Sequence, residues 1–197
     1  MDVFIFLNAT TALFVIIDPI GTSLIFNSLI GSDEASFRIR TAFKASMISA
    51  ALLILFGNYG ELLLGQLGIS IQAFRISGGI LLFYTAFTMI TSQLTFHKKD
   101  SSGDISVFPM SIPLLAGPGS LTVSILLFSS ADGTAEQVSV FLAVLLVCLM
   151  TFICMGLSVH VKKIMGRMGD EMLRRFLGVL LAALAIQFIL DGVVEIL

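Results

Sequence analysis

The sequence contains no tryptophan, two tyrosines, two cysteines and two histidines among 197 residues, and only 12% of its residues are charged. A soluble globular domain usually has about 25% charged residues, so the composition argues against a water-soluble fold. Cys148 and Cys154 lie in one apolar run without a histidine cluster, which excludes metal-ligand and redox spacing. Because tryptophan and tyrosine are scarce, aromatic belts cannot mark the ends of membrane spans.

Hydrophobic residues are abundant instead, at 57% of the chain, and they form long runs without charge. A transmembrane helix needs about 20 mostly apolar residues to cross ~30 Å of hydrocarbon. Such runs predict six spans, at residues 3–30, 42–64, 72–94, 105–130, 137–160 and 175–196. The expected fold class is an all-α polytopic membrane protein. Residues 1–197 are expected to form a single membrane domain, with the lipid bilayer as partner and no nucleic acid.

The positions of lysine and arginine predict the orientation of the spans. With both termini outside the cytoplasm, ten of the eleven basic residues fall on the inner side and only Arg75 lies outside. The loop "SSADGTAEQ" between spans four and five contains no lysine or arginine. The positive-inside rule therefore favours this orientation, with the polar segment 97–104 as a cytoplasmic loop.

The two halves of the chain share a pattern. Arg75 and Arg175 head spans three and six, and Gly78 and Gly178 follow three residues later in each. Likewise "DPIGTS" in span one corresponds to "AGPGSLT" in span four. A three-span unit repeated in tandem must be inverted the second time, because three is odd. The pattern thus predicts repeats at 1–96 and 105–197, an architecture common among secondary transporters.

All four prolines lie in spans one and four, at Pro19, Pro109, Pro113 and Pro118. A break in a membrane helix is tolerated where it is buried in protein or lines a wet cavity, and the freed backbone groups can then become ligands. Helix N-termini that follow Pro19 and Pro118 suit a carboxylate, through the N–H groups of residues 20–22 and 119–121. An ordinary proline kink is the alternative. The candidate substrate-binding residues are Asp18, Pro19, Gly21, Thr22, Ser23, Gly117, Pro118, Gly119, Ser120 and Thr122.

Asp18 is a carboxylate near the middle of span one. A charge there costs about 2.5–3.5 kcal/mol on insertion scales, and such residues usually mark a pathway or an ion site. Asp18 could bind a substrate ammonium group, or couple H⁺ or Na⁺. Alternatively, it caps the half-helix that starts at Pro19. An aspartyl dyad with Asp191 would make the protein an enzyme, but the two carboxylates fall at different depths, so no catalytic residue is predicted.

The segments "DPIGTSLIF" and "PMSIPLLAGPGSLT" resemble the two signature segments of the MarC family of bacterial inner-membrane proteins. "FRISGGILLF" and "FLGVLLAALAIQFILDG" are similar to the third and sixth spans of that family. Asp18 stands where the family pattern has Asn, and Leu24 replaces a second Pro. The resemblance implies the bacterial inner membrane, six spans, periplasmic termini and a link to small neutral amino acids.

The expected function is therefore secondary transport of a small zwitterionic solute, by alternating access around the broken spans one and four. No nucleotide-binding motif is present, so an ion gradient must drive any accumulation, and no cofactor or metal site is expected. The alternative is a membrane scaffold or assembly protein that transports nothing. Small residues at Ala42, Ala45, Ser46 and Ser49 could pack within one chain or between chains of a homo-oligomer.

Overall fold

The computed structural model describes residues 2–30, 35–91 and 104–194. Within these ranges the chain is helical and contains no strand, which confirms the predicted all-α class. The elements are α1 (Val3–Ile17), α2 (Pro19–Ile30), α3 (Ala35–Gln66), α4 (Ile71–Thr91), η1 (Ser106–Leu115), α5 (Pro118–Ser129), α6 (Thr134–Gly156) and α7 (Ser158–Val194).

Among the described residues, three helical stretches are long and apolar enough to cross a membrane, judged by length and composition alone. They are Val3–Asn27, Ala35–Gln66 and Thr134–Gly156. The first of these includes the turn at Asp18. Shorter apolar helices occupy Ile71–Tyr84, Gly119–Ser129 and Gly178–Val194. These six segments fall within or overlap the six predicted spans.

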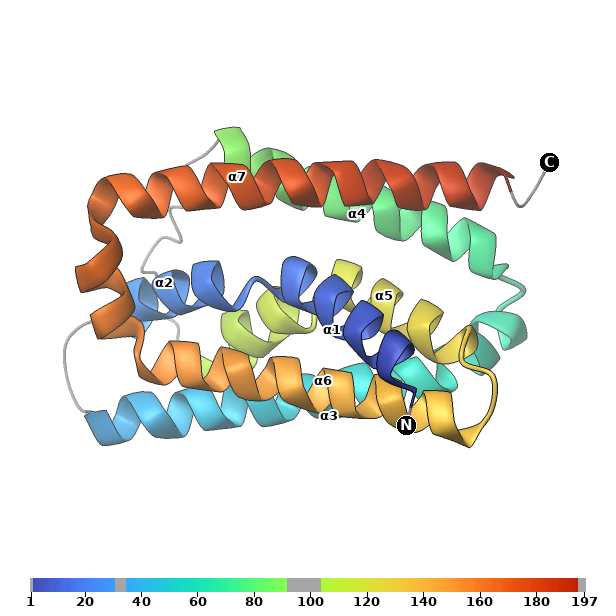
Figure 1. Cartoon of the computed structure of the whole chain (residues 1–197), viewed down its shortest axis with the longest axis horizontal. Coiled ribbons are helices and arrows are strands. Elements are labelled where there is room, and N and C mark those ends of the chain that lie inside the picture. Colours follow the sequence, from blue (N-terminus) through green and yellow to red (C-terminus); the bar gives the residue numbers. More distant parts are fainter. Residues whose placement is uncertain (1, 31–34, 92–103, 195–197) are drawn as a thin grey trace.

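The boundaries differ from the prediction at two connections. Helix α3 begins at Ala35, seven residues before predicted span two (42–64). Residues 161–174, expected as a loop between the last two spans, are helical and belong to α7, which bends close to its start (Figure 1). The segment contains no proline and holds three Met, two Lys and two Arg residues, all good helix formers, so polarity alone did not end the helix. The end of predicted span three (92–94) and loop residues 97–103 lie outside the described residues.

The helices run along the long axis of the molecule in three groups (Figure 1). Helices α4 and α7 pack along one side, and α3 and α6 pack together on the other. The α1–α2 and η1–α5 segments lie between these two pairs. The α1–α2 segment contacts α6 and α7, and the η1–α5 segment contacts α3 and α4. The start of α1 and the end of α7 lie at the same end of the molecule, with the α3–α4 and α5–α6 connections.

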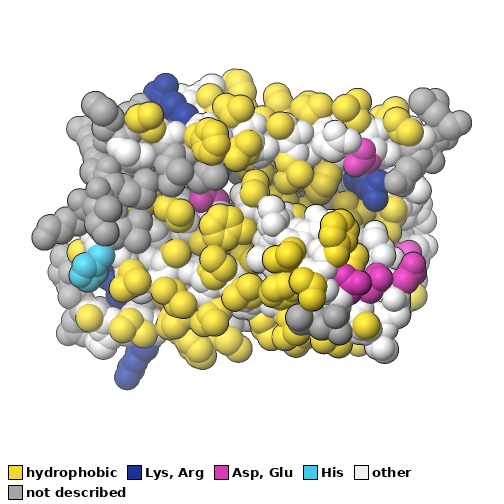
Figure 2. All heavy atoms as spheres, in the orientation of Figure 1, with side chains coloured by type: hydrophobic (Ala, Val, Ile, Leu, Met, Phe, Trp, Pro, Cys, Tyr) yellow, Lys and Arg dark blue, Asp and Glu magenta, His cyan; other side chains and the backbone are white. Residues whose placement is uncertain are grey.

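The surface is apolar where a soluble protein would be polar. Hydrophobic side chains cover the long middle part of the face in Figure 2, and most of the charged side chains shown lie toward its two ends. Among the large hydrophobic residues, Leu62, Tyr84 and Phe176 are each more than half exposed. Conversely, the small residues Ala42, Ala45, Ser46 and Ser49 of α3 are buried within this one chain.

Small residues allow the helices to approach closely. A Cβ atom added to Gly79 of α4 would lie 2.8 Å from the carbonyl oxygen of Ala185 in α7. On another pair of helices, the Ser124 hydroxyl of α5 donates to the Leu53 carbonyl oxygen of α3 at 2.7 Å. In lipid, where apolar burial gives little driving force between helices, such close contacts and hydrogen bonds hold helices together.

We predict that Gly79→Ala lowers the stability of the protein by about 1–3 kcal/mol, because the backbone of α7 must move to admit the methyl group. Gly65→Ala is the matched control, since nothing lies within 4 Å of a Cβ at Gly65. That change should be neutral or slightly stabilising, because Ala favours helix over Gly by up to about 1 kcal/mol. Thermal unfolding in detergent measures both, and equal effects at the two positions would contradict the prediction.

Candidate functional site

The first interruption is centred on Asp18, between α1 and α2. Asp18 has φ 46° and ψ 72°, the left-handed conformation, and is the one non-glycine residue with positive φ in the described part of the chain. Aspartate tolerates this conformation better than most residues, because its short polar side chain bonds locally. Pro19 follows at the first position of α2, where a missing N–H costs nothing.

The Asp18 side chain closes the start of α2. Its Oδ1 atom accepts a hydrogen bond from the Gly21 N–H at 2.9 Å, and Asp18 is only 9% exposed. Glycine at position 21 leaves room for this contact, because a Cβ atom there would collide with the Asp18 carboxylate. The structure thus contains the helix cap that the sequence offered as the simpler role of Asp18.

The second interruption extends over η1 and its junction with α5. Phe108 and Ile112, each directly before a proline, have extended backbones, with φ −130° and ψ 127°, and φ −123° and ψ 122°. Proline sterically disfavours the helical conformation of the preceding residue, so the sequence dictates both irregularities. Ala116 and Gly117 then leave the helix before Pro118 begins α5. This half of the chain is therefore more irregular than the first, where α2 continues unbroken to Ile30.

Buried hydroxyl groups satisfy carbonyl oxygens that the interruptions release. Thr22 Oγ1 donates to the Ile17 carbonyl at 2.8 Å, and Ser120 Oγ donates to the Leu115 carbonyl at 2.6 Å. Each hydroxyl bridges its interruption to the residue five positions earlier, so both junctions use one device. Ser111 Oγ, which sequence reasoning missed, donates to the Ser106 carbonyl at 2.6 Å and to Ala45 of α3 at 3.1 Å. Its position between Pro109 and Pro113 was the available signal.

Three of the backbone N–H groups expected to bind an anion already have acceptors, which corrects that expectation. The Gly21 N–H is taken by the Asp18 side chain, and the Thr22 N–H donates to the Asp18 carbonyl at 2.8 Å. The Leu121 N–H donates to the Gly117 carbonyl at 2.9 Å. The fourth residue from a cap can already form an intrahelical bond, so only the earlier donors of a helix start can serve a ligand. For α5 these are Gly119 and Ser120.

The structure buries the predicted site residues in two groups. Asp18, Pro19, Gly21, Thr22 and Ser23 are buried or nearly so at the first interruption, and Gly117, Gly119, Ser120 and Thr122 at the second. The helices that carry them touch, since α1 contacts α5 and α2 contacts η1. Both interruptions lie in the central part of the long axis (Figure 1).

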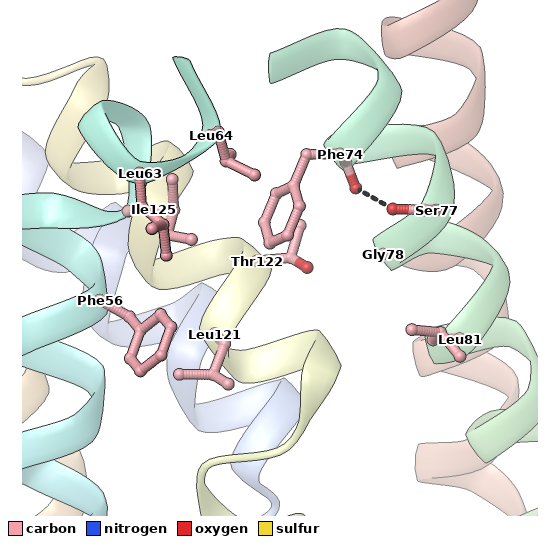
Figure 3. A pocket seen from close by; sticks show the side chains of 11 residues that line it. Phe56, Leu63, Leu64, Phe74, Ser77, Gly78, Leu81, Leu121, Thr122 and Ile125 are labelled. Atoms are coloured by element: carbon pink, nitrogen blue, oxygen red, sulfur yellow. Dashed lines mark hydrogen bonds between the residues drawn. The ribbon is translucent and has the colours of Figure 1, made fainter. Parts of the chain in front are cut away.

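A cavity lies beside the second of these groups, at Thr122. It has a volume of about 260 Å³ and is bounded by α3, α4 and α5 (Figure 3). Its walls are mostly leucine, phenylalanine and isoleucine side chains, and of the predicted site residues Thr122 lines it. Its apolar walls do not suit a zwitterion, so the cavity and the Asp18 region are chemically distinct.

Arg38 is a buried residue whose position the sequence did not reveal, because it was counted only as an inner-side charge. It is 7% exposed, and its Nη1 atom donates to Asn27 Oδ1 at 2.7 Å and to Ser158 Oγ at 2.9 Å. It thereby ties α3 to the end of α2 and to the start of α7. Arg38 lies three and four residues before Thr41 and Ala42, so all three share one face of α3. That face is buried.

An exposed ion pair lies at the same end of α3. Lys44 Nζ and Asp104 Oδ2 are 2.8 Å apart, and Asp104 also accepts hydrogen bonds from Ser106 at the start of η1. The hydrogen bonds from Lys44 and then Ser106 lower the pKa of the Asp104 carboxyl to about 2. The carboxylate therefore remains charged at physiological pH, and it holds the start of η1 against α3.

Apolar helices of membrane-spanning length, an apolar surface and two interrupted helices in the interior define a polytopic α-helical membrane protein. The family described as "MarC family integral membrane protein" matches residues 3–197, and the chain belongs to this family. The chain is 33% identical to a UPF0056 membrane protein of Methanocaldococcus jannaschii, with 98% of each protein covered. It is 31% identical to a UPF0056 membrane protein of Aquifex aeolicus, covering 98% of this chain and 94% of the relative. No solved structure matches the chain significantly.

The cap at Asp18 predicts a stability order among its variants. Asp18→Asn should unfold close to the wild type, because Asn caps helices about as well and tolerates the left-handed conformation. Asp18→Ala should lose about 2–3 kcal/mol, since it removes the cap and strains the backbone. Asp18→Gly removes the capping carboxylate but adopts the left-handed conformation without strain, so its stability should fall between those of the other two variants. Thermal unfolding of the purified variants measures the order, and an Ala variant as stable as the Asn variant would refute the cap.

Proposed function

We propose that the protein is a secondary transporter of small neutral amino acids, which bind between the interrupted helices and cross by alternating access. In this proposal the chain has six spans in two inverted repeats, 1–96 and 105–197. The α1–α2 pair and the η1–α5 pair are the broken spans one and four. The observation that carries the proposal is the buried carboxylate of Asp18 at an interruption whose helices contact the second interrupted segment.

The pattern of helix contacts supports the inverted repeat. Exchanging the halves turns α1 into η1, α2 into α5, α3 into α6 and α4 into α7. Under this exchange the α1–α6 contact becomes η1–α3, α2–α6 becomes α5–α3, and α2–α7 becomes α5–α4, and all of these contacts are present. The α3–α6 and α4–α7 contacts map onto themselves. The hydroxyls of Thr22 and Ser120 add a further likeness between the halves, because each donates across its interruption to a carbonyl five residues earlier.

The chemistry around the interruptions suits a small zwitterion. The first turn of α5 presents the N–H groups of Gly119 and Ser120 and the positive end of the helix dipole to a carboxylate. Asp18 supplies the negative charge for an ammonium group, or carries the coupling H⁺ or Na⁺. The neighbourhood is tightly packed, because a Cβ atom on Gly119 would collide with the Leu82 side chain. A small substrate such as glycine, alanine or serine therefore fits best, and no catalytic residue is required.

The second candidate function is a membrane scaffold that transports nothing. The observation that favours it is the internal satisfaction of the interruptions, whose donors at Gly21, Thr22 and Leu121 already have acceptors. The two candidates differ in ligand binding, because a scaffold needs no site for a zwitterion.

The proposed orientation predicts which side of the membrane each connection faces. In a variant with Cys148 and Cys154 replaced by alanine, Gln137→Cys should react with an impermeant thiol reagent added to intact cells from the periplasmic side. Arg40→Cys and Lys99→Cys should react only after the membrane is opened, because positively charged segments stay in the cytoplasm. The opposite pattern would reverse the orientation. Labelling of Gln137→Cys and Lys99→Cys from the same side would remove the inverted repeat.

The transport proposal predicts that purified protein in liposomes accumulates labelled alanine against an imposed H⁺ or Na⁺ gradient. Asp18→Asn should reduce accumulation to the level without a gradient while retaining exchange of bound alanine, because the cap survives and only the titratable group is lost. Asp191→Asn is the matched control, since that carboxylate bonds to Gln187 near the end of α7. Wild-type accumulation by Asp18→Asn would remove its coupling role. Binding of a neutral amphiphile but not of alanine would refute the substrate class.

A further inference from the structure

The cavity between α3, α4 and α5 has no role in the proposed zwitterion site. Figure 3 shows Phe56, Leu63 and Leu64 of α3 on one side and Phe74, Gly78 and Leu81 of α4 on the other. The cavity lies toward the end of the molecule where α3 ends and α4 begins. Its walls are almost entirely hydrocarbon, so its occupant must be apolar.

The mouth of the cavity is continuous with the apolar outer surface. Leu63 and Leu81, which line the cavity, are 45% and 47% exposed, and Ser77 beside them is exposed as well. Leu62, the chain neighbour of Leu63, is 64% exposed on the apolar surface of α3. In an integral membrane protein this surface faces lipid hydrocarbon, so the cavity opens sideways toward the bilayer.

We propose that the acyl chain of a phospholipid occupies this cavity. Apolar cavities of about 150 Å³ stay dry and take up apolar molecules the size of benzene, and this cavity is larger, at about 260 Å³. Without an occupant its walls would lose van der Waals contacts on one side. The bilayer supplies acyl chains at this depth, and they are as apolar as the leucine side chains that form the walls.

The chemistry of the cavity walls distinguishes the lipid site from the region of Asp18. Thr122 of α5 packs so closely against Gly78 of α4 that a Cβ atom at Gly78 would collide with its side chain. Leu81 and Leu121 line the cavity on the side of this contact toward the start of α5, and they too are apolar. The lipid site is therefore distinct from the proposed zwitterion site, and it does not depend on transport.

The absence of tryptophan makes the proposal directly testable by fluorescence. Phe56→Trp places a single reporter in the cavity wall, and phospholipids brominated along their acyl chains quench tryptophan only at short range. Purified Phe56→Trp in liposomes of brominated lipid should be strongly quenched relative to liposomes of the unbrominated lipid. The added change Ser77→Phe, which fills the mouth, should remove most of this quenching. Tyr59→Trp, 62% exposed on the same helix, is the control that should be quenched with or without Ser77→Phe.

The outcomes separate the occupants. If Phe56→Trp is unquenched while Tyr59→Trp is quenched, no acyl chain enters the cavity and the proposal is overturned. It is also overturned if Ser77→Phe leaves the quenching of Phe56→Trp unchanged. Quenching that appears only when the protein is diluted in the membrane would identify a second copy of the chain as the occupant, which likewise overturns the proposal. Should Phe56→Trp fail to fold, Leu63→Trp replaces it. Ser77→Phe should then protect Leu63→Trp but not the adjacent control Leu62→Trp.

Discussion

Backbone groups released by a break in a membrane helix must find partners within the protein, because lipid offers none. The structure meets this constraint locally at each interruption. The Asp18 carboxylate caps the start of α2, and the Thr22 and Ser120 hydroxyls each reach back to a carbonyl five residues earlier. Ser111 does the same within η1 and also bonds to the backbone of α3. Without these side chains, neither interrupted segment could remain buried.

The packing of the other helices follows from where these segments lie. The interrupted segments occupy the interior, so α3 with α6 and α4 with α7 must pack around them and still contact each other. Close approach through small residues makes this arrangement feasible, as at Gly79 and at the Ser124–Leu53 hydrogen bond. Arg38 adds a buried polar tie at one end, between α2, α3 and α7. Other large apolar side chains, such as those of Leu62, Tyr84 and Phe176, are left to face the lipid.

The molecule therefore offers two environments of opposite character. The interruptions gather a carboxylate, hydroxyls and helix ends in a tightly packed interior, which suits the proposed small zwitterion. The cavity beside α4 has hydrocarbon walls and a mouth on the lipid-facing surface, which suits an acyl chain. Thr122, predicted as a site residue, lines the cavity and packs against Gly78 of α4.

The sequence by itself determined the all-α membrane class, the apolar segments and the sites where prolines interrupt helices, because these depend on local rules. Apolar runs predict membrane helices, and a proline restricts the residue before it, as at Phe108 and Ile112. Asp18 followed by Pro19 predicted a helix cap, because Asp is favoured at the cap and Pro at the first helical position. Only the tertiary structure decided which groups are free, which residues are buried and where space remains. The sequence indicated only that Arg38 is a charge on the inner side. Its burial depends on contacts with residues up to 120 positions away, which only the folded chain brings together. The cavity was equally invisible, because its walls come from three helices that meet only in the folded chain.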